Sequence, residues 1–331
     1  MTILVTGGTG FVGSAVVRAL LERGERLRVM SRASSDRALL DGLDVEPVIG
    51  DLDDADSLKS AVSGCRALFH VAADYRLWVP DPSTINRTNI EGTQNLMRAA
   101  IDAGVERIVY TSSVATLGLT GGKEPADETT PSGLGQMIGH YKRSKFLAEE
   151  TVQALIAEGL PAVIVNPSAP IGPRDAKPTP TGRLVLDLAK GKLPAVVDTG
   201  LNVVHVDDVA KGHLLAFDHG IIGERYILGG DNLHLIEIAE NVAAIAGVRP
   251  PSLKLPVGLI MPVAHAVEAL WRLTGRTDEP FVTIDGLRMA RKLMFFSSAK
   301  AERDLGYRPR PAAKAFEDAI IWYRDQGHLK P

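Results

Sequence analysis

Three regularly spaced glycines near the N-terminus constrain the fold more than any other feature of this chain. Residues Thr2–Thr6 form an apolar, β-branched run that predicts a strand, and Phe11–Arg23 has the amphipathic period of a helix. The connection Thr6–Gly13 reads TGGTGFVG, with glycines at positions 7, 10 and 13. This segment therefore predicts a strand–loop–helix unit, from which sheets of parallel strands are built.

The spacing of these glycines also points to a ligand. Gly7 permits a tight turn, Gly10 lets the backbone approach a pyrophosphate, and Gly13 lets the helix pack closely on the strand. The first turn of the helix offers free N–H groups and the positive end of the helix dipole. The residues expected to bind the phosphates of a dinucleotide are Gly7, Thr9, Gly10, Phe11, Val12 and Gly13. The alternative is a structural turn without a ligand.

Short apolar runs alternate with helical patterns through the first half of the chain. Strands are expected at 27–31, 45–49, 67–71, 108–112 and 162–166, and helices at 54–63, 86–103 and 141–158. This alternation predicts an α/β protein with a doubly wound parallel sheet, the Rossmann arrangement. Several strands are almost wholly apolar, as expected where helices cover both faces of a sheet.

The pattern changes after Pro167, where prolines become frequent. The elements expected there are a helix at 181–190, a strand at 203–206 and a helix at 207–218, with Asp207 or Asp208 as its N-cap. The rest is mainly helical. We therefore expect a dinucleotide-binding domain at 1–168 plus about 199–229. A smaller, mainly helical substrate domain is expected at about 169–198 plus 230–331.

The overall composition argues against several classes of function. The formal net charge of −3 and the pI of about 6.3 do not suit a protein that binds nucleic acid through a basic surface. The single cysteine, Cys65, allows neither an internal disulfide nor a cysteine-based metal site, and we expect it in the core and no metal. The chain shows no pattern of a signal peptide or transmembrane helix, so a cytoplasmic protein is expected.

The apolar stretch Leu255–Leu273 comes nearest to the length of a membrane span. It is interrupted by Pro256, Pro262, His265 and Glu268. The pattern predicts an amphipathic helix that joins the core or covers a pocket. A helix at a membrane surface is the alternative.

The end of the second expected strand bears on the choice of dinucleotide. Sites for NAD usually carry an acidic residue there, whereas an arginine accommodates the 2′-phosphate of NADP. Ser31 and Arg32 occupy this place, and the first acidic residue is Asp36. The sequence therefore favours NADP, with NAD as the alternative if Arg32 is a solvated cation beside the adenine. Asp51 and Leu52 are expected at the adenine too, unless Asp51 caps a turn.

A tyrosine and a lysine lie four residues apart in the helix expected at 141–158. Tyr141 and Lys145 share one face of that helix. A free tyrosine has a pKa of about 10, and a neighbouring ammonium favours the phenolate and lowers that value. Ser112 and Ser113, at the end of the preceding strand, supply a hydroxyl to orient a carbonyl. Together they predict an acid–base centre, whereas Tyr-x-x-x-Lys alone is equally an exposed helix pair.

These motifs and their order resemble the extended short-chain dehydrogenase/reductases, the group of NAD-dependent epimerases/dehydratases and dihydroflavonol reductases. The resemblance rests on TGGTGFVG (6–13), GDL (50–52), HVAA (70–73), NIEGT (89–93), TSS (111–113), YKRSK (141–145), VHVDDVA (204–210) and KAERDLGYRP (300–309). It implies that Ser113, Tyr141 and Lys145 are catalytic, with Tyr141 exchanging the proton and Lys145 also holding the nicotinamide ribose. It further implies cofactor contacts from Ala72, Ala73, Pro167 and Ser168.

Within that group the chain is most similar to the hopanoid-associated sugar epimerases (HpnA). The segments concerned are AADYRLW (72–78), SSVATLGL (112–119), IGHYKRSK (138–145), NPSAPIGPRDAKPTP (166–180) and MARKLMFFSSA (289–299). One departure is Ala169, which stands where nucleotide-sugar epimerases usually carry an asparagine and so argues against a nucleotide-sugar substrate. Tyr75, Trp78 and Ser113 are expected to face the substrate, although the aromatic pair would equally serve to anchor its loop.

Three functions stay open at this stage. The first is an oxidoreductase or epimerase that transfers hydride at a hydroxyl or carbonyl carbon of a sugar-like or hopanoid-linked small molecule. The second is an NADP-dependent carbonyl reductase of the dihydroflavonol-reductase type. The third is a regulatory protein that binds NADP without catalysis, and the complete set of Ser113, Tyr141 and Lys145 counts against it. The helices at 86–103 and 141–158 are expected to form a homodimer.

Overall fold

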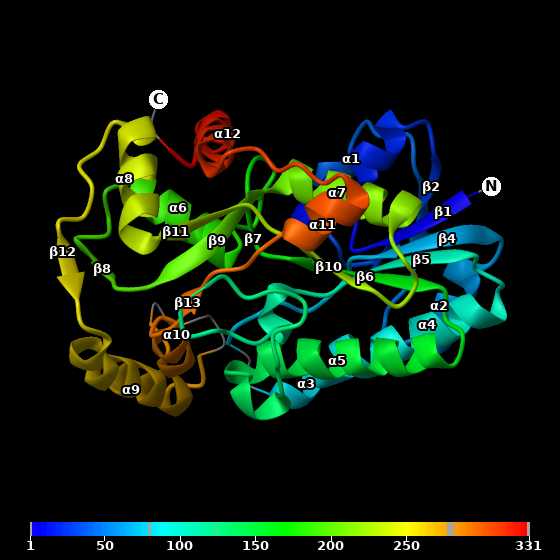
Figure 1. The fold of residues 1–331 in the computed structure, drawn as a ribbon, viewed down its shortest axis with the longest axis horizontal. Helices are drawn as coiled ribbons and strands as arrows, with labels where there is room; N and C mark the ends of the chain where they lie inside the picture. The colour runs from blue at the N-terminus through cyan, green and yellow to red at the C-terminus, as the bar shows by residue number, and fades with distance from the viewer. Residues whose placement is uncertain (1, 79–80, 123, 277–279, 281, 330–331) are drawn as a thin grey trace.

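The computed structural model describes residues 2–78, 81–122, 124–276, 280 and 282–329, and its largest element is a sheet of seven parallel strands (Figure 1). The strand order is β10-β6-β5-β4-β1-β2-β3. These strands are β1 (Thr2–Thr6), β2 (Arg26–Ser31), β3 (Glu46–Ile49), β4 (Cys65–His70), β5 (Arg107–Thr111), β6 (Ala162–Pro167) and β10 (Arg225–Leu228). The order reverses between β1 and β4, which confirms the predicted doubly wound sheet.

Helices cover both faces of this sheet (Figure 1). One layer holds α1 (Phe11–Glu22), α7 (Val206–His219) and α11 (Ala299–Leu305), and the other holds α2 (Ala55–Val62), α4 (Gly92–Asp102) and α5 (Gly139–Ala157). Ile3 and Val5 join the core on the α1 side, whereas Leu4 between them joins the core on the α2 side with Leu58. Successive residues of a strand point to opposite faces, so a strand covered on both sides is apolar throughout.

Two helices differ from the prediction at their N-termini. The helix expected at 86–103 begins earlier, as α3 (Pro82–Asn86), and continues through a π-helical turn, Arg87–Glu91, into α4. Asp81 starts it by accepting a hydrogen bond from the Ser83 nitrogen. Helix α7 is capped by His205, whose Nδ1 accepts from the Asp207 nitrogen at 3.0 Å.

The prediction of Asp207 or Asp208 as the N-cap of α7 was therefore wrong. Asp207 is the first acidic residue inside the helix and forms an ion pair with Arg174. Asp208 is buried and accepts a two-pronged ion pair from Arg310. Both carboxylates thus face partners from distant segments, which sequence spacing could not indicate.

The chain also forms a second, smaller sheet. Its strands are β7 (Ala169–Ile171), β9 (Gly200–His205), β11 (Asp231–His234) and β13 (Leu293–Met294), and a separate pair is formed by β8 (Ala195–Val197) and β12 (Leu253–Leu255). Helices α6 (Pro180–Ala189), α8 (Leu235–Ala246) and α12 (Ala312–Asp325) share one core with β7, β8 and β9. The strand expected at 203–206 thus lies in this sheet, whereas the following α7 packs on α1.

Helix α9 (Val257–Leu273) lies at the far end of the molecule beside α10 (Ile284–Met289) (Figure 1). Its buried residues are Ala264 and Glu268, while Leu259, Val263, Leu270 and Leu273 are exposed. The prediction of a core helix was therefore wrong, while the predictions of a helix that covers a pocket or lies at a membrane surface stay predictions. Within the described residues, no helix combines the length and the apolar character that a membrane span requires.

Candidate active site

The residues expected at the cofactor lie along one edge of the seven-stranded sheet. Each stands at or just past the carboxyl end of its strand: Gly7 (β1), Ser31 (β2), Asp51 (β3), Ala72 (β4), Ser113 (β5) and Ser168 (β6). In open parallel sheets, ligands bind at this edge where the strand order reverses, here between β1 and β4. Tyr141 and Lys145 approach the same edge from the first two turns of α5.

The glycine loop is packed too closely to admit side chains at two positions. Gly7 has a φ of +72°, and a Cβ there would lie 2.6 Å from the Ala72 nitrogen. A Cβ on Gly13 would lie 2.0 Å from the carbonyl oxygen of Gly7. Gly10 caps α1 without a side chain, which leaves the first-turn N–H groups, including those of Phe11 and Val12, for an anion. This cradle fits the pyrophosphate of a dinucleotide.

The end of β2 brings together a hydroxyl and two arginines. Ser31 is buried, and its Oγ accepts a hydrogen bond from Nε of Arg37 at 3.1 Å. Arg32 follows with an exposed side chain. Asp36 caps the next turn by accepting from the Ala38 nitrogen at 3.1 Å. Sequence reasoning missed Arg37, although a second arginine close behind Arg32 was a visible signal.

Asp51 and Leu52 have structural contacts of their own. The Asp51 carboxylate accepts from the Asp53 nitrogen at 3.1 Å, which is the turn cap that the sequence left as an alternative. Leu52 is 6% exposed and belongs to the core, where a Cβ on Gly92 would lie 2.7 Å from the Leu52 Cβ. Their contact with the adenine stays a prediction.

A buried chain of hydrogen bonds fixes the residues after β4 against the glycine loop. Thr6 Oγ1 lies 2.7 Å from His70 Nδ1 and accepts from the Ala72 nitrogen at 3.3 Å. His70 Nε2 lies 3.0 Å from Thr93 Oγ1. Burial lowers the pKa of His70 to about 3, so the ring is neutral. Ala72 is thereby held beside Gly7, and the neighbouring Ala73 is partly exposed.

Ser168 carries a polar atom without a partner. It follows the buried Pro167 at the end of β6 and is 9% exposed, and its Oγ is buried without a hydrogen-bond partner among the described residues. A buried hydroxyl normally has a partner. This orphaned group, at the edge where the cofactor is expected, fits a contact with a bound ligand.

The side chains of Tyr141 and Ser113 come together, and their catalytic roles stay a prediction. Burial raises the pKa of Tyr141, and a hydrogen bond with the Ser113 side chain lowers it in part. Ser113 is also the N-cap of a short 3-10 helix, Val114–Thr116, and accepts from the Ala115 nitrogen at 3.1 Å. The two hydroxyls thus meet although they are far apart in the chain. The phenol is kept protonated, which suits a proton donor.

Lys145 is buried and contacts the end of β5. Its Nζ donates to the Thr111 carbonyl oxygen at 2.8 Å and to the Tyr110 hydroxyl at 3.3 Å, and it lies 4.9 Å from the centre of the Tyr110 ring. Burial lowers the pKa of Lys145 to about 8, and Glu149 acts in the opposite direction. The expected influence of Lys145 on the pKa of Tyr141 stays a prediction. Tyr110 was missed because a tyrosine within an apolar strand suggests only packing.

A buried carboxylate organises the loop that carries Ser113. Glu149 is 3% exposed and accepts from Thr116 Oγ1 and Asn166 Nδ2, both at 2.9 Å, and from the Ser112 hydroxyl. Asn166 also donates to the Ser113 carbonyl oxygen at 3.0 Å. Arg225 Nη1 also donates to Glu149 Oε1 at 3.1 Å, so a positive charge as well as hydrogen bonds stabilises the buried carboxylate. It was missed because Glu149 lies one helical turn beyond Lys145 and looks like an ordinary surface residue.

The two aromatic residues expected at the substrate lie on the loop after β4. Tyr75 is 47% exposed, and the indole nitrogen of Trp78 is buried without a partner in the described part of the chain. The Arg272 guanidinium lies 5.8 Å from the centre of the Trp78 ring. Asn89 anchors this loop, because its side chain exchanges hydrogen bonds with the backbone of residue 74 at 2.7 and 2.8 Å. Trp78 therefore contacts α9, which the sequence did not indicate.

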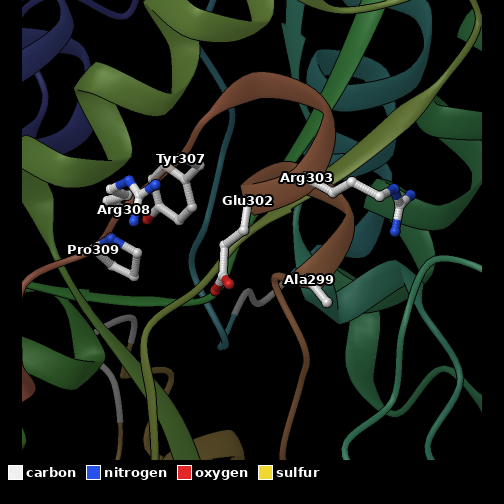
Figure 2. Close-up of a pocket in the computed structure, with 6 residues that line it drawn as sticks. All are labelled: Ala299, Glu302, Arg303, Tyr307, Arg308 and Pro309. Carbon is white, nitrogen blue, oxygen red and sulfur yellow. The ribbon is translucent and has the colours of Figure 1, made fainter.

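Two hollows lie outside the glycine loop. One borders α5 and is lined mainly by apolar side chains: Ala115, Leu117, Leu119, Met137, Ile138, Met289 and Met294, with Lys142 and Lys292. The other, drawn in Figure 2, is formed entirely by residues 299–309 and includes none of the expected site residues. In Figure 2 Arg303 extends away from Tyr307 and Pro309. The described residues contain no cluster of ligands placed for a metal ion.

Comparison with known proteins agrees with this geometry. The sequence model of the NAD dependent epimerase/dehydratase family matches residues 3–229. The solved structure of gox2253 shares 57% identity, with a TM-score of 0.90 and 99% coverage of both chains. A Synechocystis sp. protein whose provisional name is dihydroflavonol 4-reductase is 43% identical over 98% of this chain and 95% of its own length. Sterol demethylase protein B of Methylococcus capsulatus is 36% identical over 99% of this chain and 100% of its own length.

The matched region runs from β1 through β10 and so contains the glycine loop, Ser113, Tyr141 and Lys145. The relatives cover nearly the whole chain, including the second sheet and α9. The chain is therefore an enzyme of the NAD-dependent epimerase/dehydratase family, within the extended short-chain dehydrogenase/reductases.

Proposed function

We propose that this enzyme is an NADP-dependent oxidoreductase that interconverts a ketone and a secondary alcohol on an apolar, polycyclic small molecule. The observation that carries the proposal is the hydrogen-bonded pair of Tyr141 and Ser113 beside the buried Lys145. The pair lies at the sheet edge that also holds the glycine cradle. A binding protein without catalysis has no need of this pair.

A nicotinamide held at this edge would supply hydride to the carbonyl carbon of a ketone or accept it from the carbinol carbon of an alcohol. In the reductive direction, Tyr141 donates its hydroxyl proton to the carbonyl oxygen, and Ser113 donates a hydrogen bond to the same oxygen. The raised pKa of Tyr141 in the free enzyme keeps that proton in place. The positive charge of Lys145, buried one helical turn away, stabilises the phenolate left behind.

The proposed preference for NADP rests on the end of β2. Ser31 and Arg37 are joined by a hydrogen bond, and Arg32 is exposed beside them. Arginines bind phosphate oxygens strongly because their N–H groups form a fork. We expect Arg32→Ala/Arg37→Ala to weaken NADPH binding about tenfold to a hundredfold and NADH binding less than about threefold, by calorimetry. Arg23→Ala, at an exposed ion pair with Asp218, is the matched control. An equal loss for both dinucleotides would contradict the proposal.

The proposed substrate class draws on the lining beside α5 and on the relatives. Leucine, isoleucine and methionine side chains line the hollow there, together with two lysines. One relative is named a sterol demethylase protein and another is provisionally named for a dihydroflavonol. A rigid apolar skeleton suits such a surface better than a hydroxyl-rich sugar. A hopanoid-linked substrate, as the sequence resemblance implies, belongs to this class.

The second candidate function is a redox-neutral epimerase, which the family's name and the sequence resemblance favour. The region after β6 argues against a nucleotide sugar. Ala169 takes the place of the expected asparagine, and the nearby Asn166 is fully buried with its Nδ2 donating to Ser113, Thr116 and Glu149. The Asn166 side-chain nitrogen therefore donates its hydrogen bonds within the protein interior.

One experiment separates these functions. The purified enzyme is incubated with NADPH and, in turn, a ketosteroid, a polycyclic triterpenoid ketone and a dihydroflavonol, and loss of NADPH fluorescence is followed. Stoichiometric oxidation of NADPH with formation of the alcohol supports the reductase. The epimerase is supported instead if the nicotinamide stays bound through purification and does not exchange with added NADPH. The enzyme should then also interconvert sugar epimers.

The expected assembly is a homodimer through α4 and α5, and we keep it as part of the proposal. Ile101, in α4, is the one residue of these helices among the large apolar side chains exposed in the described part of the chain. Sedimentation equilibrium of the wild-type enzyme and of Ile101→Glu tests whether this face carries the association. The division into a cofactor part and a substrate part, and the cytoplasmic location, also stay proposals.

A further inference from the structure

The hollow that borders α5, here called the α5 hollow, is built from three segments that are distant in the sequence. Residues 115–119 follow β5, residues 136–142 lead into α5 and form its start, and residues 289–294 run from the end of α10 into β13. The hollow encloses about 80 Å³. It therefore admits a small group at the end of a molecule, while a polycyclic skeleton stays outside.

Two lysines stand out in the mainly apolar lining of the α5 hollow. The polar side chains of the lining are Gln136, Lys142 and Lys292. Lys142 is partly buried, and its Nζ lies 3.7 Å from the sulfur of Met294, which is only a weak acceptor. Lys292 is exposed, and its backbone is held in place because Thr199 Oγ1 donates to its carbonyl oxygen at 2.9 Å. Two ammonium groups thus border one small apolar space.

The charges of these lysines are not neutralised by the protein. Within the described residues, neither Lys142 nor Lys292 forms an ion pair with a carboxylate. Asp285 of α10, which lies against the start of α5, pairs instead with Arg288 at 3.2 Å. Burial and the positive charge of Lys292 lower the pKa of Lys142 to about 8. A cation among apolar groups is stabilised by a nearby anion, so a bound ligand is the natural source of one.

The α5 hollow begins beside the proposed acid–base pair. Lys142 is the residue that follows Tyr141 in the first turn of α5. Ala115, which also lines the hollow, donates its backbone N–H to Ser113 Oγ at 3.1 Å. The lining thus comes within two residues of both side chains that would hold the reacting oxygen. A substituent on a molecule bound at that oxygen is therefore expected to enter the hollow.

We propose that the α5 hollow binds an anionic group of the substrate, a carboxylate or a phosphate monoester, through the ammonium groups of Lys142 and Lys292. This inference rests on the proposed function for the apolar skeleton, and it adds the charged group that orients that skeleton. The anion accepts charge-assisted hydrogen bonds and offsets the repulsion between the two lysines. The apolar lining strengthens the attraction because it lowers the local dielectric constant. A neutral hydroxyl gains little of this attraction.

Calorimetry with flexible amphiphiles tests the anion site without any ketone. The probes are decanoate, decyl phosphate and decanol, each titrated into the full-length enzyme in the presence of NADP. We expect wild type to bind at least one of the anions at least about tenfold more tightly than decanol, and the tighter of the two identifies the anionic group.

Paired lysine variants locate the binding to the α5 hollow. Lys142→Met/Lys292→Met should bind the three probes alike, because it keeps the apolar lining and removes both charges. Lys142→Arg/Lys292→Arg should restore the preference for the anion. The matched control is Lys190→Met/Lys192→Met, which removes two charges from exposed lysines outside the hollow and should behave as wild type.

Three results would overturn the anion site: equal affinity of wild type for decanol and both anions, no binding of any probe, or a preference that survives in Lys142→Met/Lys292→Met. Turnover gives a separate readout. For a ketosteroid that carries a carboxylate, KM should rise about tenfold more in this variant than KM for its methyl ester. Anion preference without turnover of any ketone would refute the proposed function and leave the anion site in place. Turnover of neutral ketones without anion preference would do the reverse.

Discussion

Strand β1 and helix α9 are both strongly apolar, yet the exposure of their side chains differs. Ile3, Leu4 and Val5 are fully buried, because helices of the same chain cover both faces of the sheet. Leu259 and Leu273 are 70 and 85% exposed, because α9 has neighbours on one side. An apolar pattern predicts that a surface will be buried. It does not predict whether the same chain or another molecule buries it.

This difference predicts where substitutions matter. In the sheet half of the molecule, backbone and side chains are packed so closely that a single atom is excluded at Gly13. At α9, whole side chains face outward. Changes in the first region should therefore alter activity or the free energy of unfolding strongly. Changes in the second should leave the free energy of unfolding nearly unchanged.

The largest effect is expected for Tyr141→Phe. Loss of the hydroxyl removes the proton donor and its bond with Ser113, so kcat should fall about a thousandfold. NADPH affinity, measured by calorimetry, should change less than about twofold because the ring remains. Tyr226→Phe removes another buried hydroxyl, the one that accepts from the Ile221 nitrogen, and should retain turnover. Substantial turnover in Tyr141→Phe would refute the assignment.

Gly13→Ala tests the close packing of the glycine loop. Its Cβ would lie 2.0 Å from the Gly7 carbonyl oxygen, so α1 or the loop must move. Urea unfolding should show a loss of about 3 kcal/mol, and dinucleotide binding should fall with it. Gly258→Ala in α9 is the matched control, since the added Cβ meets open space there and the free energy of unfolding should hold or rise slightly. Equal effects at both sites would contradict the comparison.

Lys145 offers a pH-dependent test of the buried site. Burial lowers its pKa from 10.5 to about 8, so between these values the unfolded chain binds a proton that the folded chain does not. The free energy of unfolding of the wild type should therefore rise with pH across this window, by about 3 kcal/mol relative to Lys145→Met. Urea unfolding of both proteins at matched pH values measures the difference. A difference that does not vary with pH would show that Lys145 is solvated.

The smallest effect on stability is expected for Leu259→Glu/Leu270→Glu. Both side chains already face outward, so the free energy of unfolding should change by less than about 1 kcal/mol. Leu68→Ala, at a fully buried position of β4, should cost about 3 kcal/mol in the same urea titration. A large loss of unfolding free energy in the α9 variant would mean that other parts of the protein bury Leu259 and Leu270.

Much of the fold was predictable because it depends on local patterns. The glycines at 7, 10 and 13, the alternation of strands and helices, and the Tyr141–Lys145 spacing each have a short-range physical cause. The match of the chain to its family confirms the fold and the enzyme class that these patterns indicated. Arg37, Asn89 and Glu149 were missed because their partners are separated from them by several to many residues, and spacing alone does not reveal such contacts.

The sequence by itself determined the parallel sheet, the dinucleotide cradle and the residue types of the acid–base centre, because local backbone geometry and strand–helix order govern these features. Only the tertiary structure decided that His205, and not Asp207 or Asp208, caps α7. It also placed the strand expected at 203–206 in the second sheet and left the apolar side of α9 exposed. These outcomes depend on which distant segments come together, since burial is a property of the whole packed chain and not of any one stretch of it.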